Sequence, residues 1–64
     1  MNKYTYYKVI QENWNGLWDD VDFHETNSQF FCKDRKLFKE NLKAYRENSP
    51  APVRVIRRRE LATT

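Results

Sequence analysis

The sequence of 64 residues has little of what small domains commonly use for stability or chemistry. Its one cysteine, Cys32, allows no disulfide within the chain. Its one glycine, Gly16, excludes the glycine-rich loops that hold phosphate groups in nucleotide-binding folds. No apolar run is long enough for a membrane span or a signal-peptide core. We therefore expect one small domain, residues 1–64, in a reducing compartment, with the cytoplasm as the default.

Aromatic and basic residues are what the sequence does contain. The two Trp, four Tyr and four Phe residues partly offset the short length, because each can bury a large area. The net charge of +3 is unevenly spread, since residues 1–31 hold two basic and five acidic side chains and residues 32–64 hold ten basic and four acidic. Either the two halves pair their charges within the fold or across a dimer, or the basic half contacts a polyanion.

The local patterns predict an α+β domain of order β-β-α-β. Residues 4–13 are rich in β-branched and aromatic side chains, and Asn-Gly at 15–16 is a strong hairpin signal, so we predict a hairpin over about 4–24. A helical period predicts a helix over about 34–48, capped by Asp34. A third strand is expected at about 53–58, followed by a frayed C-terminus. We expect a mainly antiparallel three-stranded sheet with the helix on one face; the strand order stays open.

The predicted turn fixes a register and therefore two faces. Trp14 pairs with Leu17, Ile10 with Val21 and Lys8 with Phe23. The expected core face carries Tyr6, Ile10, Trp14, Leu17, Val21 and Phe23. The expected bare face carries Tyr7, Val9 and Trp18 among Gln11, Asp20, Asp22 and His24. An exposed aromatic patch on a small domain usually marks a contact surface. We therefore predict protein–protein contact, and a homodimer in particular, through Tyr7, Val9, Trp18 and Ile56.

The residue types that carry chemistry do not form a convincing site. Asp20, Asp22 and His24 alternate on one strand, but side chains two apart are about 6–7 Å apart, which is wide for chelation. We interpret them as a solvated acidic strand and His24 as a surface histidine, because no nucleophile accompanies it. Cys32 is interpreted as a partly buried structural cysteine. We predict no catalytic residues, no metal site, no cofactor and no small-molecule substrate, so the protein is not expected to be an enzyme.

The alternative function is weak, sequence-independent nucleic-acid binding by the basic half. Its predicted contacts are Arg54, Arg57, Arg58, Arg59, Lys36, Lys39 and Lys43. Acidic residues on the bare face would repel a phosphate backbone, so these contacts would use the outer side of the helix and the C-terminus. A third interpretation is a structural piece of a larger assembly that folds fully only with its neighbours.

Several segments together give the chain a resemblance to small accessory proteins of tailed phages and prophages of enteric bacteria. These segments are Tyr-Tyr-Lys-Val-Ile at 6–10, the Trp18 hairpin, Leu-Lys-Ala-Tyr-Arg at 42–46, Asn-Ser-Pro at 48–50 and Arg-Val-Ile-Arg-Arg at 54–58. Such proteins often bind a host or phage protein. The resemblance implies a binding role in the cytoplasm of a bacterial host and carries over no catalytic residue.

Overall fold

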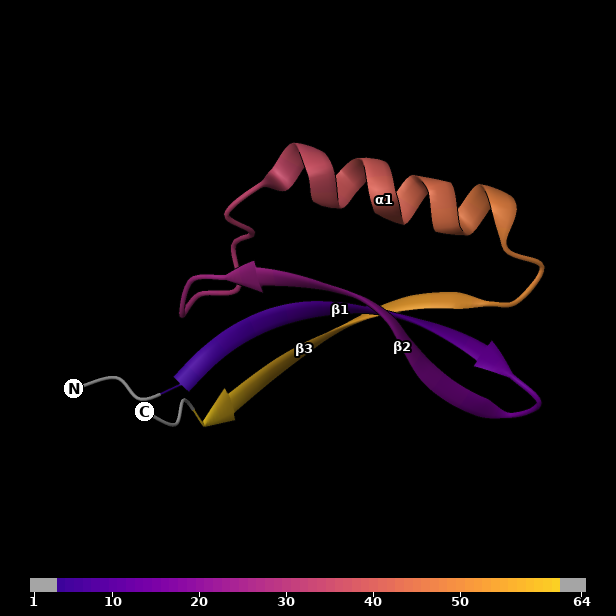
Figure 1. Ribbon diagram of the computed structural model, residues 1–64, viewed down its shortest axis with the longest axis horizontal. Coiled ribbons are helices and arrows are strands. Elements are labelled where there is room, and N and C mark those ends of the chain that lie inside the picture. Colours follow the sequence, from indigo (N-terminus) through magenta and orange to yellow (C-terminus); the bar gives the residue numbers. More distant parts are fainter. Residues whose placement is uncertain (1–3, 62–64) are drawn as a thin grey trace.

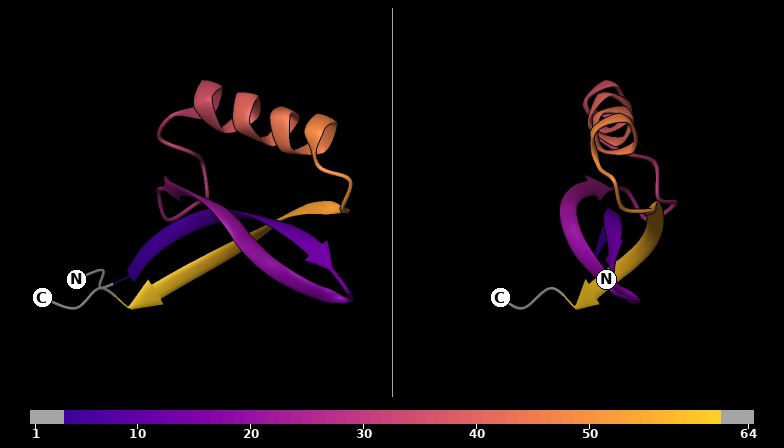
Figure 2. Two further views of the ribbon diagram at one scale, coloured as in Figure 1. Left: turned by 45° about the vertical axis from the view of Figure 1, so that its right-hand side comes forward. Right: turned by 90° about the vertical axis from the view of Figure 1, so that its right-hand side faces the viewer.

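The computed structural model describes residues 4–61 and has the order β-β-α-β (Figure 1). Strand β1 spans Tyr4–Trp14, β2 spans Leu17–Thr26, helix α1 spans Arg35–Asn48 and β3 spans Val53–Leu61. β1 lies between β2 and β3 and is antiparallel to both. The helix lies over one face of the sheet and leaves the other face open (Figure 2). The predicted α+β fold is confirmed.

The turn between β1 and β2 is the predicted two-residue hairpin loop. Trp14 pairs with Leu17, and both loop residues have positive φ, 56° at Asn15 and 83° at Gly16. The backbone N–H of Gly16 donates to the side-chain oxygen of Asn13 at 3.0 Å. Asn and Gly tolerate this backbone conformation better than other residues, which explains their strength as a turn signal.

A β-bulge at Val21 interrupts the hairpin. Gln11 pairs with Asp20, but the next residue of β1, Ile10, pairs with Asp22, so Val21 is an extra residue without a partner on β1. A bulge of this kind increases the local twist, and β2 crosses β1 steeply (Figure 1). The predicted pairing of Ile10 with Val21 is therefore wrong by one residue.

Because of the bulge, each side chain in the second half of β2 lies on the sheet face opposite to the predicted one. Lys8 pairs with His24 rather than Phe23, and Phe23 lies opposite Val9. Phe23 thus faces the open side of the sheet, whereas Asp22 and His24 face the helix. The predictions that Phe23 lies on the core face and His24 on the surface are both wrong.

The core lies between the sheet and α1. Its buried centre is formed by Ile10, Cys32 and Phe38, and partly buried apolar side chains surround it: Val21, Leu42, Tyr45, Val53 and Val55. The prediction of a structural cysteine is confirmed, since Cys32 is buried and free. Trp14 and Leu17, predicted in the core, are exposed at the hairpin tip, which curves away from the helix (Figure 1).

The ends of α1 follow the sequence signals. Asp34 is the N-cap, and its Oδ1 accepts from the backbone N–H of Leu37 at 3.0 Å. The helix ends at Ser49, whose N–H donates to the carbonyl of Tyr45, because the residue before Pro50 avoids the helical region. With 14 residues of mixed polarity, α1 is not a membrane-spanning helix, and residues 4–61 hold no other helix that could be one.

Strand β3 is longer than predicted. The segment 59–61, expected to fray, pairs with residues 4–6 of β1. The rest of the expected frayed end, residues 62–64, lies outside the described residues. The additional pairing brings Arg59 onto the sheet, on the face opposite to that of Arg58, because side chains alternate along a strand.

Candidate binding surfaces

The open face of the sheet carries a row of apolar residues that crosses all three strands. Phe23 on β2, Val9 on β1 and Ile56 on β3 are direct neighbours in the register. Tyr7 extends the row, and its ring meets that of Phe23 edge-on at 6.1 Å between centroids. Phe23 is 51% exposed, so at β2 the row reaches solvent and is not covered by another of the residues 4–61.

A polar network lies beside the apolar row. Gln11 is nearly buried and donates to Asp20 at 2.6 Å, while its carbonyl oxygen accepts from Arg54 Nε at 2.8 Å. Arg58 reaches the same carboxylate of Asp20 with both terminal nitrogens, at 2.5 and 3.3 Å. The guanidinium of Arg54 also stacks on the ring of Trp18, 4.1 Å from its centroid. The network fixes both arginines in place.

Charge pairing shifts the ionisation of this network. The hydrogen bond from Arg58, followed by that from Gln11, holds the pKa of Asp20 below its usual value. The same bond with Asp20 raises the pKa of Arg58. Together with the ion pair of Lys33 with Glu25 at 2.9 Å, the Arg58–Asp20 pair joins the basic and acidic halves of the chain. Some of the basic side chains of the second half are therefore neutralised by acidic side chains of the first half within the fold.

The structure changes the predicted contact surface in three ways. Val9 has no exposed area and cannot touch a partner. Trp18 is partly covered by Arg54 and separated from the apolar row by the polar network. Phe23, which the sequence placed in the core, is the most exposed member of the row. Tyr7 and Ile56 do lie on the open face, each half-buried. The bulge at Val21 has no signal in the local sequence pattern, so Phe23 was missed.

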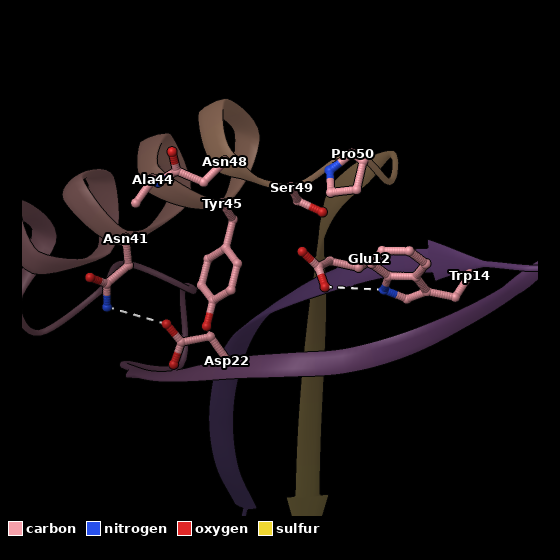
Figure 3. Close-up of a pocket in the computed structure, with 9 residues that line it drawn as sticks. All are labelled: Glu12, Trp14, Asp22, Asn41, Ala44, Tyr45, Asn48, Ser49 and Pro50. Atoms are coloured by element: carbon pink, nitrogen blue, oxygen red, sulfur yellow. Dashed lines mark hydrogen bonds between the residues drawn. The ribbon is translucent and has the colours of Figure 1, made fainter.

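A groove on the helix side lies between the C-terminal half of α1 and the hairpin (Figure 3). It has a volume of about 510 Å³ and is lined by Glu12, Trp14, Asp22, Asn41, Ala44, Tyr45, Asn48, Ser49 and Pro50. Both charged residues among these are carboxylates. Glu12 accepts from the indole N–H of Trp14 at 3.2 Å, and Asp22 accepts from Asn41 at 3.2 Å. Burial first, and then these two carboxylates, raise the pKa of the Tyr45 phenol.

His24 is part of the structural support of this groove. Its ring is nearly buried, lies 5.1 Å from the ring of Phe38, and its Nε2 is 3.0 Å from Asp22 Oδ2. Asp20 points to the opposite face, so the sequence cluster of Asp20, Asp22 and His24 is not brought together. No group of three or more acidic, histidine or cysteine side chains within residues 4–61 is arranged to hold a metal ion.

A third surface, which we call the basic face, lies at the other end of α1. It comprises Lys8, Arg35, Lys39, Arg57 and Arg59, and none of these five makes an ion pair within the described part of the chain. Three of them instead lie over aromatic rings. Lys8 is 5.4 Å from the ring centroid of Phe38, Arg57 is 5.5 Å from that of Phe30, and Arg59 is 4.2 Å from that of Tyr4.

The loop before α1 presents two phenylalanines beside the basic face. Asn27 shapes it, because its side-chain oxygen accepts from the backbone N–H groups of Gln29 and Phe31. Phe30 has a φ of 63°, which typically costs about 1–3 kcal/mol for a bulky residue. This conformation sets the Phe30 ring edge-on against Tyr6 at 5.4 Å, while Phe31 is 58% exposed.

The predicted nucleic-acid contacts are divided among three surfaces. Arg54 and Arg58 lie on the open face in the polar network. Lys36 and Lys43 lie on the outer side of α1, where Lys43 is 3.8 Å from Glu47. Lys39, Arg57 and Arg59 lie on the basic face. Lys8 and Arg35, which the sequence analysis did not single out, complete that face because the register places Lys8 opposite Arg57.

Comparison with known proteins gives no match to a family model, to a curated protein or to a solved structure.

Proposed function

We propose that this protein is a non-catalytic accessory protein of the phage type, acting through protein–protein contacts in the cytoplasm of a bacterial host. Its first contact is with a second copy of itself, through the open face of the sheet. The observation that carries the proposal is the apolar row on the open face, in which Phe23 and Ile56 lie on either side of the buried Val9 and Phe23 is 51% exposed. Tyr7 belongs to the same contact. Tyrosine and other large aromatic side chains are the residues most enriched at the centre of protein interfaces.

The size of the chain supports a second copy as the occupant. A chain of this length has a marginal core, and only Val9, Ile10, Cys32 and Phe38 are buried apolar residues within residues 4–61. The radius of gyration is 12.8 Å, compared with about 10.7 Å expected for a compact domain of this length. An elongated two-layer shape with one bare face gains burial from a partner.

The charges of the open face also favour self-association. Asp20 is neutralised by Arg58, and Arg54 is stacked and hydrogen-bonded, so this face has no strong field of one sign. A two-fold interface brings identical patches together, and identical charges would otherwise repel each other. The acidic groove and the basic face each carry one sign of charge and do not meet this condition.

The area of the open face sets the expected affinity. Three strands about 4.8 Å apart and about nine residues long present a face of roughly 14 by 30 Å. This is below the roughly 800 Å² per partner of a standard interface, so we expect a dissociation constant in the micromolar range.

Sedimentation equilibrium over about 5 to 500 μM tests the proposal directly. We expect a concentration-dependent dimer that Phe23→Ser weakens at least about tenfold, because the variant removes the most exposed apolar contact. Trp18→Ala is expected to weaken it less without unfolding the domain. Leu17→Ser is the matched control, since Leu17 is 70% exposed but lies at the hairpin tip, away from the open face. A monomer at 500 μM, or equal weakening by Leu17→Ser, would overturn the proposal.

A further inference from the structure

The five cations of the basic face repel one another and have no carboxylate to neutralise them among residues 4–61. This distinguishes them from Arg58 and Lys33, each of which holds an acidic partner. The ring contacts of Lys8, Arg57 and Arg59 restrict these side chains without cancelling their charge. A bound anion is what would relieve the repulsion, and it would meet side chains that are already ordered.

A cleft of about 180 Å³ lies on this face, between β1 and the N-terminal half of α1. Lys8, Arg35 and Lys39 line it, and Phe38 and Cys32 contribute its apolar part. Its volume corresponds to about six water molecules at roughly 30 Å³ each, which is enough for a phosphate group. Lysine and arginine side chains are the usual ligands of phosphate oxygens.

An exposed aromatic ring lies at the same cleft. Phe31 is one of the lining residues and is 58% exposed, so one side of its ring is free for a further contact. Exposed aromatic rings beside a basic groove are typical of surfaces that bind single strands, where unpaired bases stack on them. The bases of a duplex are stacked on one another inside the double helix, so they cannot stack on this ring.

We propose that the basic face binds the phosphodiester backbone of a single-stranded nucleic acid, with a phosphate in the cleft of Lys8, Arg35 and Lys39 and a base stacked on Phe31. This surface lies on the helix side of the sheet, so the proposal does not depend on dimerisation through the open face. The Phe23→Ser variant, made for the oligomerisation test, is expected to keep the binding.

The test is fluorescence anisotropy with labelled 20-nucleotide poly-dT and poly-U strands and a 20-base-pair duplex, at 50 and 200 mM NaCl. We expect micromolar binding of the single strands at low salt. With three to five phosphates neutralised, log K should fall with log salt at a slope of about −2 to −3.5, which is roughly 20- to 130-fold between the two conditions.

Two pairs of variants locate the contact. Arg35→Gln with Lys39→Gln removes two cations from the basic face, and Lys36→Gln with Lys43→Gln removes two from the outer side of the same helix. We expect only the first pair to reduce the slope, by about 1.4. Phe31→Ala should weaken single-strand binding at least about fivefold with little change in slope, whereas Phe23→Ala, on the open face, should not.

Three results would overturn the proposal. No binding at 50 mM salt would leave the basic face without an anionic ligand of this kind. An equal loss of affinity in the two double variants would show a diffuse electrostatic attraction and not a defined binding site. A duplex bound as tightly as the single strands, together with no effect of Phe31→Ala, would show that the protein does not recognise a single strand.

Discussion

Asp20 and Asp22 are two residues apart on β2, yet their carboxylates lie on opposite faces of the sheet. In a regular strand they would share a face. The extra residue at Val21 separates them, so Asp20 joins Arg58 and Gln11 on the open face while Asp22 accepts from Asn41 of the helix. One bulge therefore gives one aspartate to the proposed dimer face and the other to the acidic groove.

Acid should weaken the fold through Asp20. Its folded pKa lies below the ordinary value of about 3.9, so its contribution is fully present above that value and is lost as the pH falls through the lowered pKa. The side chain is partly exposed, so we expect less than about 1 kcal/mol. Urea unfolding at pH 7 and pH 2.5 measures it. Asp20→Asn should lose less stability than the wild type between these two pH values, and an unchanged difference would contradict the assignment.

Gln11 should matter more than its surface-like residue type indicates. It is nearly buried and bridges Asp20 and Arg54, so Gln11→Leu leaves both charged groups without this partner. We expect a loss of about 0.5–1.5 kcal/mol in the free energy of unfolding, because water can reach both exposed charged groups. Thr5→Val, on the same face of β1 but outside the polar network, provides the comparison in chemical denaturation. A cost below about 0.5 kcal/mol for Gln11→Leu would show that the bridge contributes little.

The helix cap gives a sharper local prediction. Asp34→Ala removes the acceptor for the Leu37 N–H and should cost about 1 kcal/mol, whereas Asp34→Ser should restore most of it. Asp19→Ala is the control, because Asp19 is an exposed aspartate away from the helix. Thermal unfolding followed by circular dichroism compares the three variants. Equal stability of Asp34→Ala and Asp19→Ala would contradict the cap.

The features that were predicted correctly depend on neighbouring residues. The Asn15-Gly16 turn, the Asp34 cap and the apolar stripe of the helix each depend on residues that are close together in the sequence. The bulge at Val21 depends instead on contacts formed after the chain has folded. Asp22 reaches Asn41 and His24 reaches Phe38 only because the helix lies above them, so regular alternation was the expected pattern.

The basic face was predicted only in part, since Lys39, Arg57 and Arg59 were among the expected contacts and Lys8 and Arg35 were not. The third strand was predicted to end at about residue 58, so the pairing of Arg59 with Tyr6 was not expected. In the structure Arg57 lies over Phe30 and Arg59 over Tyr4, rings that come from distant segments. These cations and aromatic rings lie far apart in the sequence, and folding brings them together on one surface.

The attachment of the helix to the sheet should depend mainly on Phe38. It is the one buried residue of α1, and its ring contacts His24 and lies beneath Lys8. Phe38→Ala should cost about 3–5 kcal/mol. A domain of this length has a total stability of only about 3–10 kcal/mol, so a large unfolded population is expected in water at 25 °C. Circular dichroism and urea titration measure this loss.

Leu37 provides the matched control for Phe38. It is the preceding residue on the same helix, is 46% exposed and makes no part of the core, so Leu37→Ala should cost less than about 1 kcal/mol. Phe38→Leu keeps an apolar side chain in the same place and should fall between the two alanine variants. If Phe38→Ala were no more costly than Leu37→Ala, the helix would not be held by its apolar stripe. The acidic groove and the basic cleft, which both lie between helix and sheet, would then lack a fixed geometry.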